Sequence, residues 1–207
     1  MKENIFAVIL TGGKSSRMGG GIKTLNKFND KTIFERVFKN IENQVKTIII
    51  NSNQNNIFFD KYNVDIISDE LKGFLGPLAG IHAALKWHEK NNLKENWLVS
   101  IPSDTPFIPS NLINNLYLKA KQDRKDIILA KSNDKIHPVI GLWNTSLYSS
   151  LNYNLISGTR KILDWANMHK LGYLDFSNQK YDPFFNINFK EDLKTAEKIE
   201  NKYIKFI

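Results

Sequence analysis

The chain has 207 residues, 42% of them hydrophobic, with a formal net charge of +8 and no cysteine. This length favours a single domain over residues 1–207, and the composition is that of a folded globular protein rather than a disordered one. The lack of cysteine excludes disulfides, thiolate metal sites and cysteine nucleophiles. No run is long and apolar enough to cross a bilayer, and the first residues lack a secretory-signal pattern. We therefore expect a cytoplasmic protein that does not contact membranes.

Apolar, β-branched segments alternate with helix-like segments along the chain. The patterns predict strands at Ile5–Leu10, Thr47–Asn51, Val64–Ser68, Trp97–Ile101, Asp126–Ala130, Val139–Trp143 and Leu171–Phe176. They predict helices at Thr32–Asn43, Leu78–Glu89, Ser110–Gln122, Thr145–Leu151, Gly158–Met168 and Lys190–Tyr203. This alternation indicates an α/β fold with a mostly parallel sheet covered by helices on both faces. Close strand spacing around His137-Pro138 predicts an antiparallel hairpin at one edge of that sheet.

A glycine-rich, cationic loop follows the first strand. It runs from Thr11 to Lys23 and includes Lys14 and Arg17 among its cations. The loop matches neither the dinucleotide fingerprint nor the P-loop pattern. Because glycine lets backbone amides approach an anion, the loop favours phosphate binding, and a plain strand-to-helix turn is the alternative.

Polar residues follow several other strands. Asn51 ends the strand that starts at Thr47, Asp69 follows the strand that starts at Val64, and Asp104 follows the strand that starts at Trp97. In open α/β sheets, ligands bind beyond the carboxyl ends of the strands. A carboxylate beside a polyphosphate can hold Mg²⁺, whereas a helix cap is the alternative role for Asp104. For Asn51, an ordinary turn role is the alternative to nucleoside binding.

The excess of lysine and arginine has two interpretations. A nucleic-acid-binding surface would explain the computed pI of about 9.4. The lysines are scattered, however, and the chain is rich in lysine, asparagine and isoleucine throughout. We interpret the charge as compositional bias, with a part of it serving a phosphate pocket, and we expect no nucleic-acid partner.

Several motifs together resemble the molybdenum cofactor guanylyltransferases of the nucleotidyltransferase superfamily. They are Leu10-Thr-Gly-Gly-Lys-Ser-Ser-Arg-Met-Gly ending at Lys23, Ile50-Asn51-Ser-Asn, Ser68-Asp69, Gly76-Pro-Leu-Ala-Gly80, Ser103-Asp-Thr-Pro-Phe-Ile-Pro109, His137-Pro138 with Gly141-Leu-Trp, and Phe185-Asn-Ile-Asn188. They occur in the family's order over nearly the whole chain. The resemblance implies a Rossmann-like three-layer fold and transfer of GMP from GTP to molybdopterin, with release of pyrophosphate.

The resemblance also implies roles for individual residues. The backbone of Leu10, Thr11 and Gly12 would contact the nucleotide, and Asn51 and Asp69 would hold the nucleoside. Near the reacting phosphates it implies five catalytic residues: Arg17, Lys23, Asp104, Asn186 and Asn188. Asp104 would in addition be the ligand of Mg²⁺. Transient contact with molybdenum cofactor biosynthesis proteins and molybdoenzymes is a further implication.

The chain departs from the family pattern at two positions of the first loop. Thr11 stands where alanine is usual, so its hydroxyl needs a partner, and Ile22 replaces an acidic residue before Lys23. For the second substrate, the candidates are His137, Trp143 and the basic turn at Arg160 and Lys161, with a solvated helix start as the alternative for the turn. Three other functions stay open at this point: a cytidylyl- or sugar-phosphate nucleotidyltransferase, a nucleotide-binding protein without turnover, and a nucleic-acid-binding protein.

Overall fold

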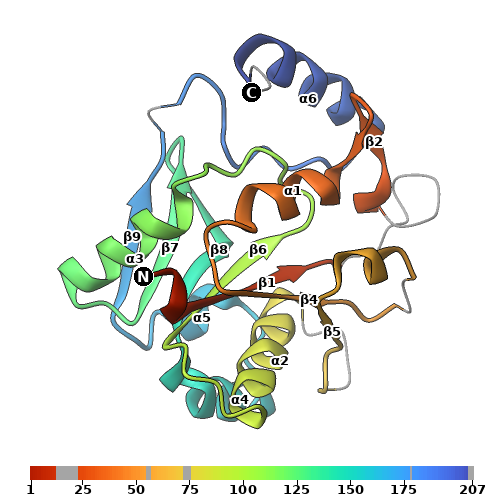
Figure 1. Cartoon of the computed structure of the whole chain (residues 1–207). Coiled ribbons are helices and arrows are strands. Elements are labelled where there is room, and N and C mark those ends of the chain that lie inside the picture. The colour runs from red at the N-terminus through yellow and green to blue at the C-terminus, as the bar shows by residue number, and fades with distance from the viewer. Residues whose placement is uncertain (13–22, 55–56, 72–75, 178, 205–207) are drawn as a thin grey trace.

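The structure is a computed structural model that describes residues 1–12, 23–54, 57–71, 76–177 and 179–204. Its centre is a seven-stranded sheet in the order β5-β4-β1-β6-β8-β7-β9 (Figure 1). The strands are β1 (Ile5–Leu10), β4 (Thr47–Asn51), β5 (Asp65–Ile67), β6 (Trp97–Pro102), β7 (Ile127–Ser132), β8 (Lys135–Asn144) and β9 (Leu171–Asp175). Neighbouring strands from β5 to β6 pair in parallel, β8 is antiparallel to both β6 and β7, and β9 is parallel to β7.

Helices cover both faces of this sheet, so the predicted mostly parallel α/β architecture is confirmed. The α-helices are α1 (Ile33–Ile41), α2 (Pro77–Lys90), α3 (Leu112–Asp123), α4 (Tyr148–Ile156), α5 (Ile162–Ala166) and α6 (Lys190–Tyr203). Side chains of α1 and α3 pack into one core cluster, and those of α2, α4 and α5 pack into a second cluster on the other face. Within the described ranges, no helix combines the length and apolar character needed to cross a membrane.

The first strand shows how the sequence produces these layers. All six residues of β1 are buried, because strands flank it on both sides and helices cover both faces. Side chains alternate between faces along a strand. Ile5, Ala7 and Ile9 accordingly belong to the first cluster, and Phe6, Val8 and Leu10 belong to the second.

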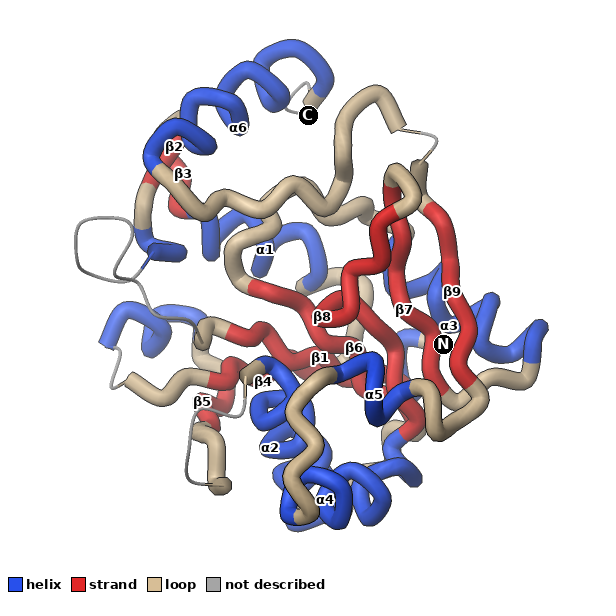
Figure 2. Tube along the Cα trace, turned by 180° about the vertical axis from the view of Figure 1, so that it is seen from behind, coloured by secondary structure: helices blue, strands red, loops and turns tan. Residues whose placement is uncertain are grey.

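A small additional layer lies above the carboxyl ends of the central strands. It contains a short hairpin of β2 (Lys27–Phe28) and β3 (Lys31–Thr32), together with α6. Phe28, Ile187 and Ala196 are buried in a third core cluster that joins these parts. Figure 2 shows that the loop between β9 and α6 passes between the sheet and α6. We call the β2–β3 hairpin, this loop and α6 the upper layer.

Short 3₁₀ helices complete the described chain. They are η1 (Lys2–Asn4), η3 (Lys23–Leu25), η4 (Ile57–Tyr62) and η5 (Thr145–Leu147).

The expected edge hairpin is only partly right. β7 and β8 do form an antiparallel pair, but β8 lies between β6 and β7, and β9 covers the outer side of β7. The strand also begins at Lys135 rather than Val139, and it contains Pro138. Its register with β7 shifts between Leu129 and Ala130, so Pro138 lies in an irregular stretch where its missing N–H is not needed for pairing with that strand.

Two helix predictions also need correction. The segment expected as one helix at Thr145–Leu151 starts as a 3₁₀ turn and continues as α4 to Ile156. The helix expected from Gly158 starts only at Ile162, because Gly158 has a φ of +102° and ends the preceding helix instead.

Candidate functional site

One ammonium group lies at the centre of the site. Lys23 Nζ donates to Asp104 Oδ2 at 2.6 Å and to Asn188 Oδ1 at 2.7 Å. It also lies 3.4 Å from Asn186 Oδ1. Asn186 Nδ2 in turn donates to Asp104 Oδ1 at 2.9 Å. We call Lys23, Asp104, Asn186 and Asn188 the charged cluster. Four of the five residues expected to be catalytic therefore lie together, and the fifth, Arg17, lies outside the described residues.

The sheet and the upper layer bring these residues together from three parts of the chain. Lys23 begins η3, Asp104 follows β6, and the two asparagines precede α6. The Ile187 N–H donates to the Asp104 carbonyl oxygen at 3.0 Å, and the Ile187 side chain is fully buried. Because successive side chains of an extended segment point in opposite directions, burial of Ile187 turns Asn186 and Asn188 toward the lysine.

The partial exposure of the central ion pair is compatible with electrostatic binding of a charged ligand. The side chains of Lys23 and Asp104 are 19% and 20% exposed. A charge pair at such a largely covered position is less screened than a surface pair, yet it is still reachable by a ligand. The ammonium can therefore attract a phosphate, and the carboxylate can attract a metal ion.

The first loop begins at the same edge of the sheet. The Thr11 N–H and its Oγ1 both donate to the Asn51 carbonyl oxygen, at 3.0 and 2.8 Å. The Thr11 hydroxyl thus has the partner that its departure from alanine requires. Among the described residues, a Cβ built on Gly12 would meet nothing within 4 Å, so these residues leave the backbone there open to a ligand. Contact of this backbone with a nucleotide stays a prediction.

Asn51 and Asp69 lie in direct contact. Asn51 Nδ2 donates to Asp69 Oδ1 at 3.0 Å. Asn53, which the sequence analysis did not single out, donates from Nδ2 to Asp69 Oδ2 at 2.8 Å, and its Oδ1 accepts from the Asp69 N–H at 2.8 Å. The two asparagines hold both carboxylate oxygens. The signal for Asn53 in the sequence was its position two residues after Asn51, within the same motif.

Gly80 of α2 packs directly against this part of the site. A Cβ at this position would lie 2.5 Å from Leu10 Cδ2 and 2.6 Å from Asn51 Oδ1. Any larger residue would displace one of these two side chains. Glycine here lets the helix approach the strand ends that carry Leu10 and Asn51.

Within the charged cluster, Asp104 is the candidate ligand for a hard divalent cation. Its carboxylate is an oxygen ligand of the kind that Mg²⁺ prefers, and in this structure the carboxylate and the two amide oxygens contact the Lys23 ammonium. Across the described ranges, no group of three or more His, Asp or Glu side chains could hold a metal by itself. A site with one carboxylate suits Mg²⁺ that also binds substrate phosphates and water.

The residues expected to bind the second substrate do not form one site. Trp143 is fully buried and donates from Nε1 to Ser100 Oγ at 2.9 Å, so it is a core residue. Arg160 donates to the carbonyl oxygens of Leu155 and Thr159, both at 2.8 Å, and thereby closes the end of α4. The position of Trp143 therefore does not support substrate binding, whereas a substrate role for the exposed Arg160 stays a prediction.

His137 belongs to a polar network below the upper layer. Its Nε2 lies 2.7 Å from Ser132 Oγ, which donates to Asp182 Oδ1 at 2.8 Å. Burial lowers the pKa of His137, and the nearby Asp182 opposes that effect. Serine stands between the other two residues, so the order is not that of a hydrolase triad, in which histidine is central. The network instead ties the β7–β8 hairpin to the loop that leads to Asn186.

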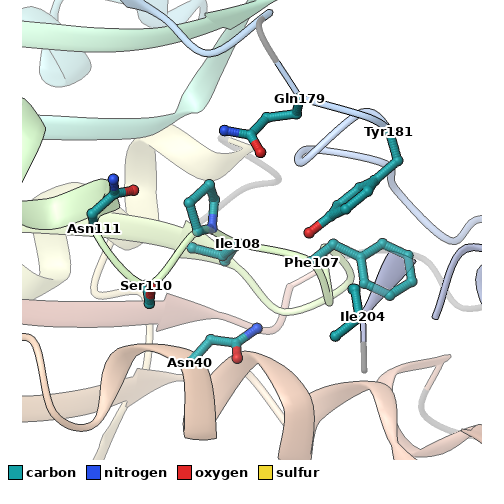
Figure 3. A pocket seen from close by; sticks show the side chains of 9 residues that line it. Asn40, Phe107, Ile108, Ser110, Asn111, Gln179, Tyr181 and Ile204 are labelled. Atoms are coloured by element: carbon teal, nitrogen blue, oxygen red, sulfur yellow. The ribbon is translucent and has the colours of Figure 1, made fainter. Parts of the chain in front are cut away.

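A pocket of about 330 Å³ lies beside the upper layer (Figure 3). It is bounded by Asn40 of α1, by residues 107–111 after β6, by Gln179 and Tyr181 of the loop before α6, and by Ile204 just after α6. It shares no residue with the charged cluster, although the chain segments that form it are the ones that carry Asp104 and Asn186.

Three comparisons identify the family. Residues 7–171 match the model of the MobA-like NTP transferase domain. The chain is 36% identical over 193 residues to the molybdenum cofactor guanylyltransferase of Nitrobacter hamburgensis, covering 93% of this chain and 92% of the relative. It is 37% identical over 194 residues to the protein of that name from Yersinia pestis, covering 93% and 94%.

A solved structure has the same fold. The molybdopterin-guanine dinucleotide biosynthesis protein A of Archaeoglobus fulgidus superposes with a TM-score of 0.77 at 26% identity, over 95% of this chain and 99% of that one. This likeness and the sequence matches agree along nearly the whole chain. The chain is therefore a nucleotidyltransferase that belongs to the family of molybdenum cofactor guanylyltransferases.

Proposed function

We propose that this protein transfers GMP from GTP to molybdopterin, forming the guanine dinucleotide form of the molybdenum cofactor and releasing pyrophosphate. The observation that carries the proposal is the charged cluster at the carboxyl edge of the sheet, in a chain whose relatives are named molybdenum cofactor guanylyltransferases. A cationic group held among oxygen ligands beside a glycine-rich loop suits a triphosphate.

In the proposed reaction, an oxygen of the molybdopterin phosphate attacks the α-phosphorus of GTP. The new bond joins that oxygen to phosphorus, and the bond from the α-phosphorus to the bridging oxygen breaks as pyrophosphate leaves. The nucleophile is already an anion, so no strong base is required. Catalysis of this type depends on positioning and on charge stabilisation, and the residues of the charged cluster supply both.

The contacts of Lys23, Asp104, Asn186 and Asn188 support the roles proposed for them, and the role of Arg17 rests on the family resemblance. Lys23 neutralises negative charge on the phosphates, and Arg17 adds a second cation there. Asn188 and Asn186 hold the lysine and orient it toward the substrate. Asp104 would hold Mg²⁺, which when bound screens the charge on the phosphates.

The nucleoside end of GTP is assigned to the neighbouring residues. The backbone of Leu10, Thr11 and Gly12 contacts the nucleotide where Gly12 leaves space. Asp69 accepts hydrogen bonds from the nucleoside while Asn51 and Asn53 keep its carboxylate in place. The protein acts in the cytoplasm, and its product passes to molybdoenzymes or to other proteins of cofactor biosynthesis through transient contacts.

A transfer assay tests the proposal. Purified protein is incubated with Mg²⁺, molybdopterin and each nucleoside triphosphate in turn, and pyrophosphate and dinucleotide are quantified. We expect one pyrophosphate per dinucleotide with GTP and little product with CTP or UTP. Transfer from CTP in preference to GTP would assign the chain to cytidylyl transfer, and GTP binding without any transfer would indicate a binding protein.

A further inference from the structure

A buried ion pair joins α1 to the upper layer. Arg36 of α1 and Glu200 of α6 are separated by 164 residues in sequence, and their side chains are only 7% and 2% exposed. Arg36 Nη1 donates to Glu200 Oε1. The other terminal nitrogen, Nη2, donates to the carbonyl oxygens of Phe28 and Asn29, at 2.7 and 3.2 Å. One guanidinium therefore holds both the β2–β3 hairpin and α6.

The hairpin takes part in the same junction. Asn29, in the turn between β2 and β3, donates from Nδ2 to Glu200 Oε2 at 2.8 Å. The Arg36 guanidinium also lies over the Phe28 ring, 4.0 Å from its centroid. Both carboxylate oxygens of Glu200 are thus bonded, one to α1 and one to the hairpin, so the rotation of α6 about this point is restricted.

The two elements joined here are those that deliver the charged cluster. The hairpin follows directly after η3, which begins with Lys23, and α6 follows directly after Asn188. At the start of α6, Asp192 Oδ2 accepts from the N–H groups of Asn188 and Phe189 at 2.7 and 2.8 Å. Asp192 therefore couples the position of α6 to the backbone of Asn188.

A pocket of about 330 Å³ lies beside the upper layer and is lined by Tyr181, Ile204 and residues of the segment after β6 (Figure 3). Apolar packing also holds α6, because Ala196 is buried in the third core cluster and Leu193 and Ile199 pack against that cluster. The Arg36–Glu200 pair adds directed polar contacts to this apolar packing.

We propose that the Arg36–Glu200 ion pair is a positioning device for the charged cluster, setting the location of Asn186 and Asn188 relative to Lys23 and Asp104. The kinetic part of this inference rests on the proposed function. Buried ion pairs are weak contributors to net stability, because desolvation offsets their attraction, and a role in fixing geometry is consistent with that balance.

The kinetic test uses Glu200→Gln, which removes the charge and nearly preserves the shape. We expect kcat for guanylyl transfer to fall roughly 10- to 100-fold, the scale of a misplacement of about 1 Å. The KM for GTP should stay within about twofold of wild type, because Asn51, Asp69 and the start of the first loop belong to other elements. Glu197→Gln is the matched control, since it makes the same chemical change on the same helix, and it should leave both constants unchanged.

A double-mutant comparison separates positioning from general destabilisation. If Glu200 acts through the asparagines, Glu200→Gln should reduce kcat by less than about threefold in a protein that already carries Asn186→Ala and Asn188→Ala. Full additivity of the two losses would overturn the inference. A loss of kcat that is matched by an equal loss of GTP binding would overturn it as well.

Amide hydrogen exchange supplies a readout that does not depend on enzyme activity. In substrate-free protein, the amides of Ile187, Asn188 and Phe189 should exchange faster in Glu200→Gln than in wild type, while those of β1 and β6 should not change. If wild type proves inactive toward GTP and molybdopterin, the proposed function fails, and this exchange measurement still decides the structural part. Unchanged exchange at the three amides would contradict it.

A milder variant covers the case in which Glu200→Gln does not fold. Asn29→Ala removes the Nδ2 hydrogen bonds to the same carboxylate and to Asn201, and it leaves the ion pair in place. It should increase exchange at the same three amides to a smaller extent and reduce kcat in proportion. Exchange and kcat equal to wild type in Asn29→Ala would then count against the inference.

Discussion

Replacing Lys23 by alanine is the sharpest perturbation of the charged cluster. The change removes an ammonium that contacts Asp104 at 2.6 Å and Asn188 at 2.7 Å, at a position where the pair is about four-fifths covered. A charge-stabilising contact of this type contributes about 2–4 kcal/mol to the transition state. At 1.36 kcal/mol per factor of ten, this corresponds to a loss of roughly 30- to 900-fold in kcat/KM.

The assay is steady-state pyrophosphate release with GTP, molybdopterin and Mg²⁺. Lys39→Ala is the matched control, because Lys39 makes an ion pair of the same length, 2.6 Å to Glu42, but its side chain is 75% exposed. The control should keep full activity, since exposed pairs contribute little. If kcat/KM of Lys23→Ala stays within about threefold of wild type, the proposed electrostatic role of Lys23 is refuted.

Three further predictions concern the metal ligand, the nucleotide pocket and stability. Asp104→Ala should nearly abolish Mg²⁺-dependent turnover while circular dichroism shows an intact fold, and turnover close to wild type would remove Asp104 from the metal site. Gly80→Ala should weaken GTP binding in calorimetric titrations and lower stability by about 1–3 kcal/mol, because the new methyl group would meet Leu10 and Asn51; an unchanged Kd would show that these side chains do not position the nucleotide. Burial lowers the pKa of His82 and His88 in the folded protein, so the unfolded chain takes up protons first as the pH falls through about 6.5. The free energy of unfolding from urea titrations should therefore be highest above that pH and should decrease toward pH 5 by up to about 1.4 kcal/mol per pH unit for each histidine. A profile that is flat or rises on acidification would contradict this assignment.

The sequence predicted the central part of the fold well because the signals there are local. β1 and α6 begin and end where the apolar patterns placed them, at Ile5–Leu10 and Lys190–Tyr203. β1 is buried on both faces, which gives a continuous apolar run. The amphipathic pattern of α6 likewise results from its packing against the third core cluster on one side only.

Features that depend on distant parts of the chain could not be predicted in the same way. The hairpin β2–β3 has two residues in each strand, too few for a periodic pattern. The position of β9 outside β7 depends on pairing between segments about 45 residues apart, which the sequence of neither segment encodes by itself. The Arg36–Glu200 pair joins two ordinary charged helix positions, and only the fold brings them together.

The residues of the candidate site likewise include some that the sequence predicted and one that it did not. Lys23, Asp104, Asn186 and Asn188 were expected to act together because their motifs resemble those of a family, and the structure brings them into contact. Asn53 was missed because asparagine is common in this chain and is an ordinary turn residue. Its role is visible only once the Asp69 carboxylate is seen between two amides.

A crystal structure of the protein with Mg²⁺ and a non-hydrolysable GTP analogue would test the proposed site most directly. We expect the phosphates to lie against the backbone of Thr11 and Gly12, Lys23 Nζ to contact a phosphate oxygen, and a metal ion to bind the Asp104 carboxylate. A nucleotide bound elsewhere, with the Lys23–Asp104 contact unchanged at 2.6 Å, would contradict the proposed site.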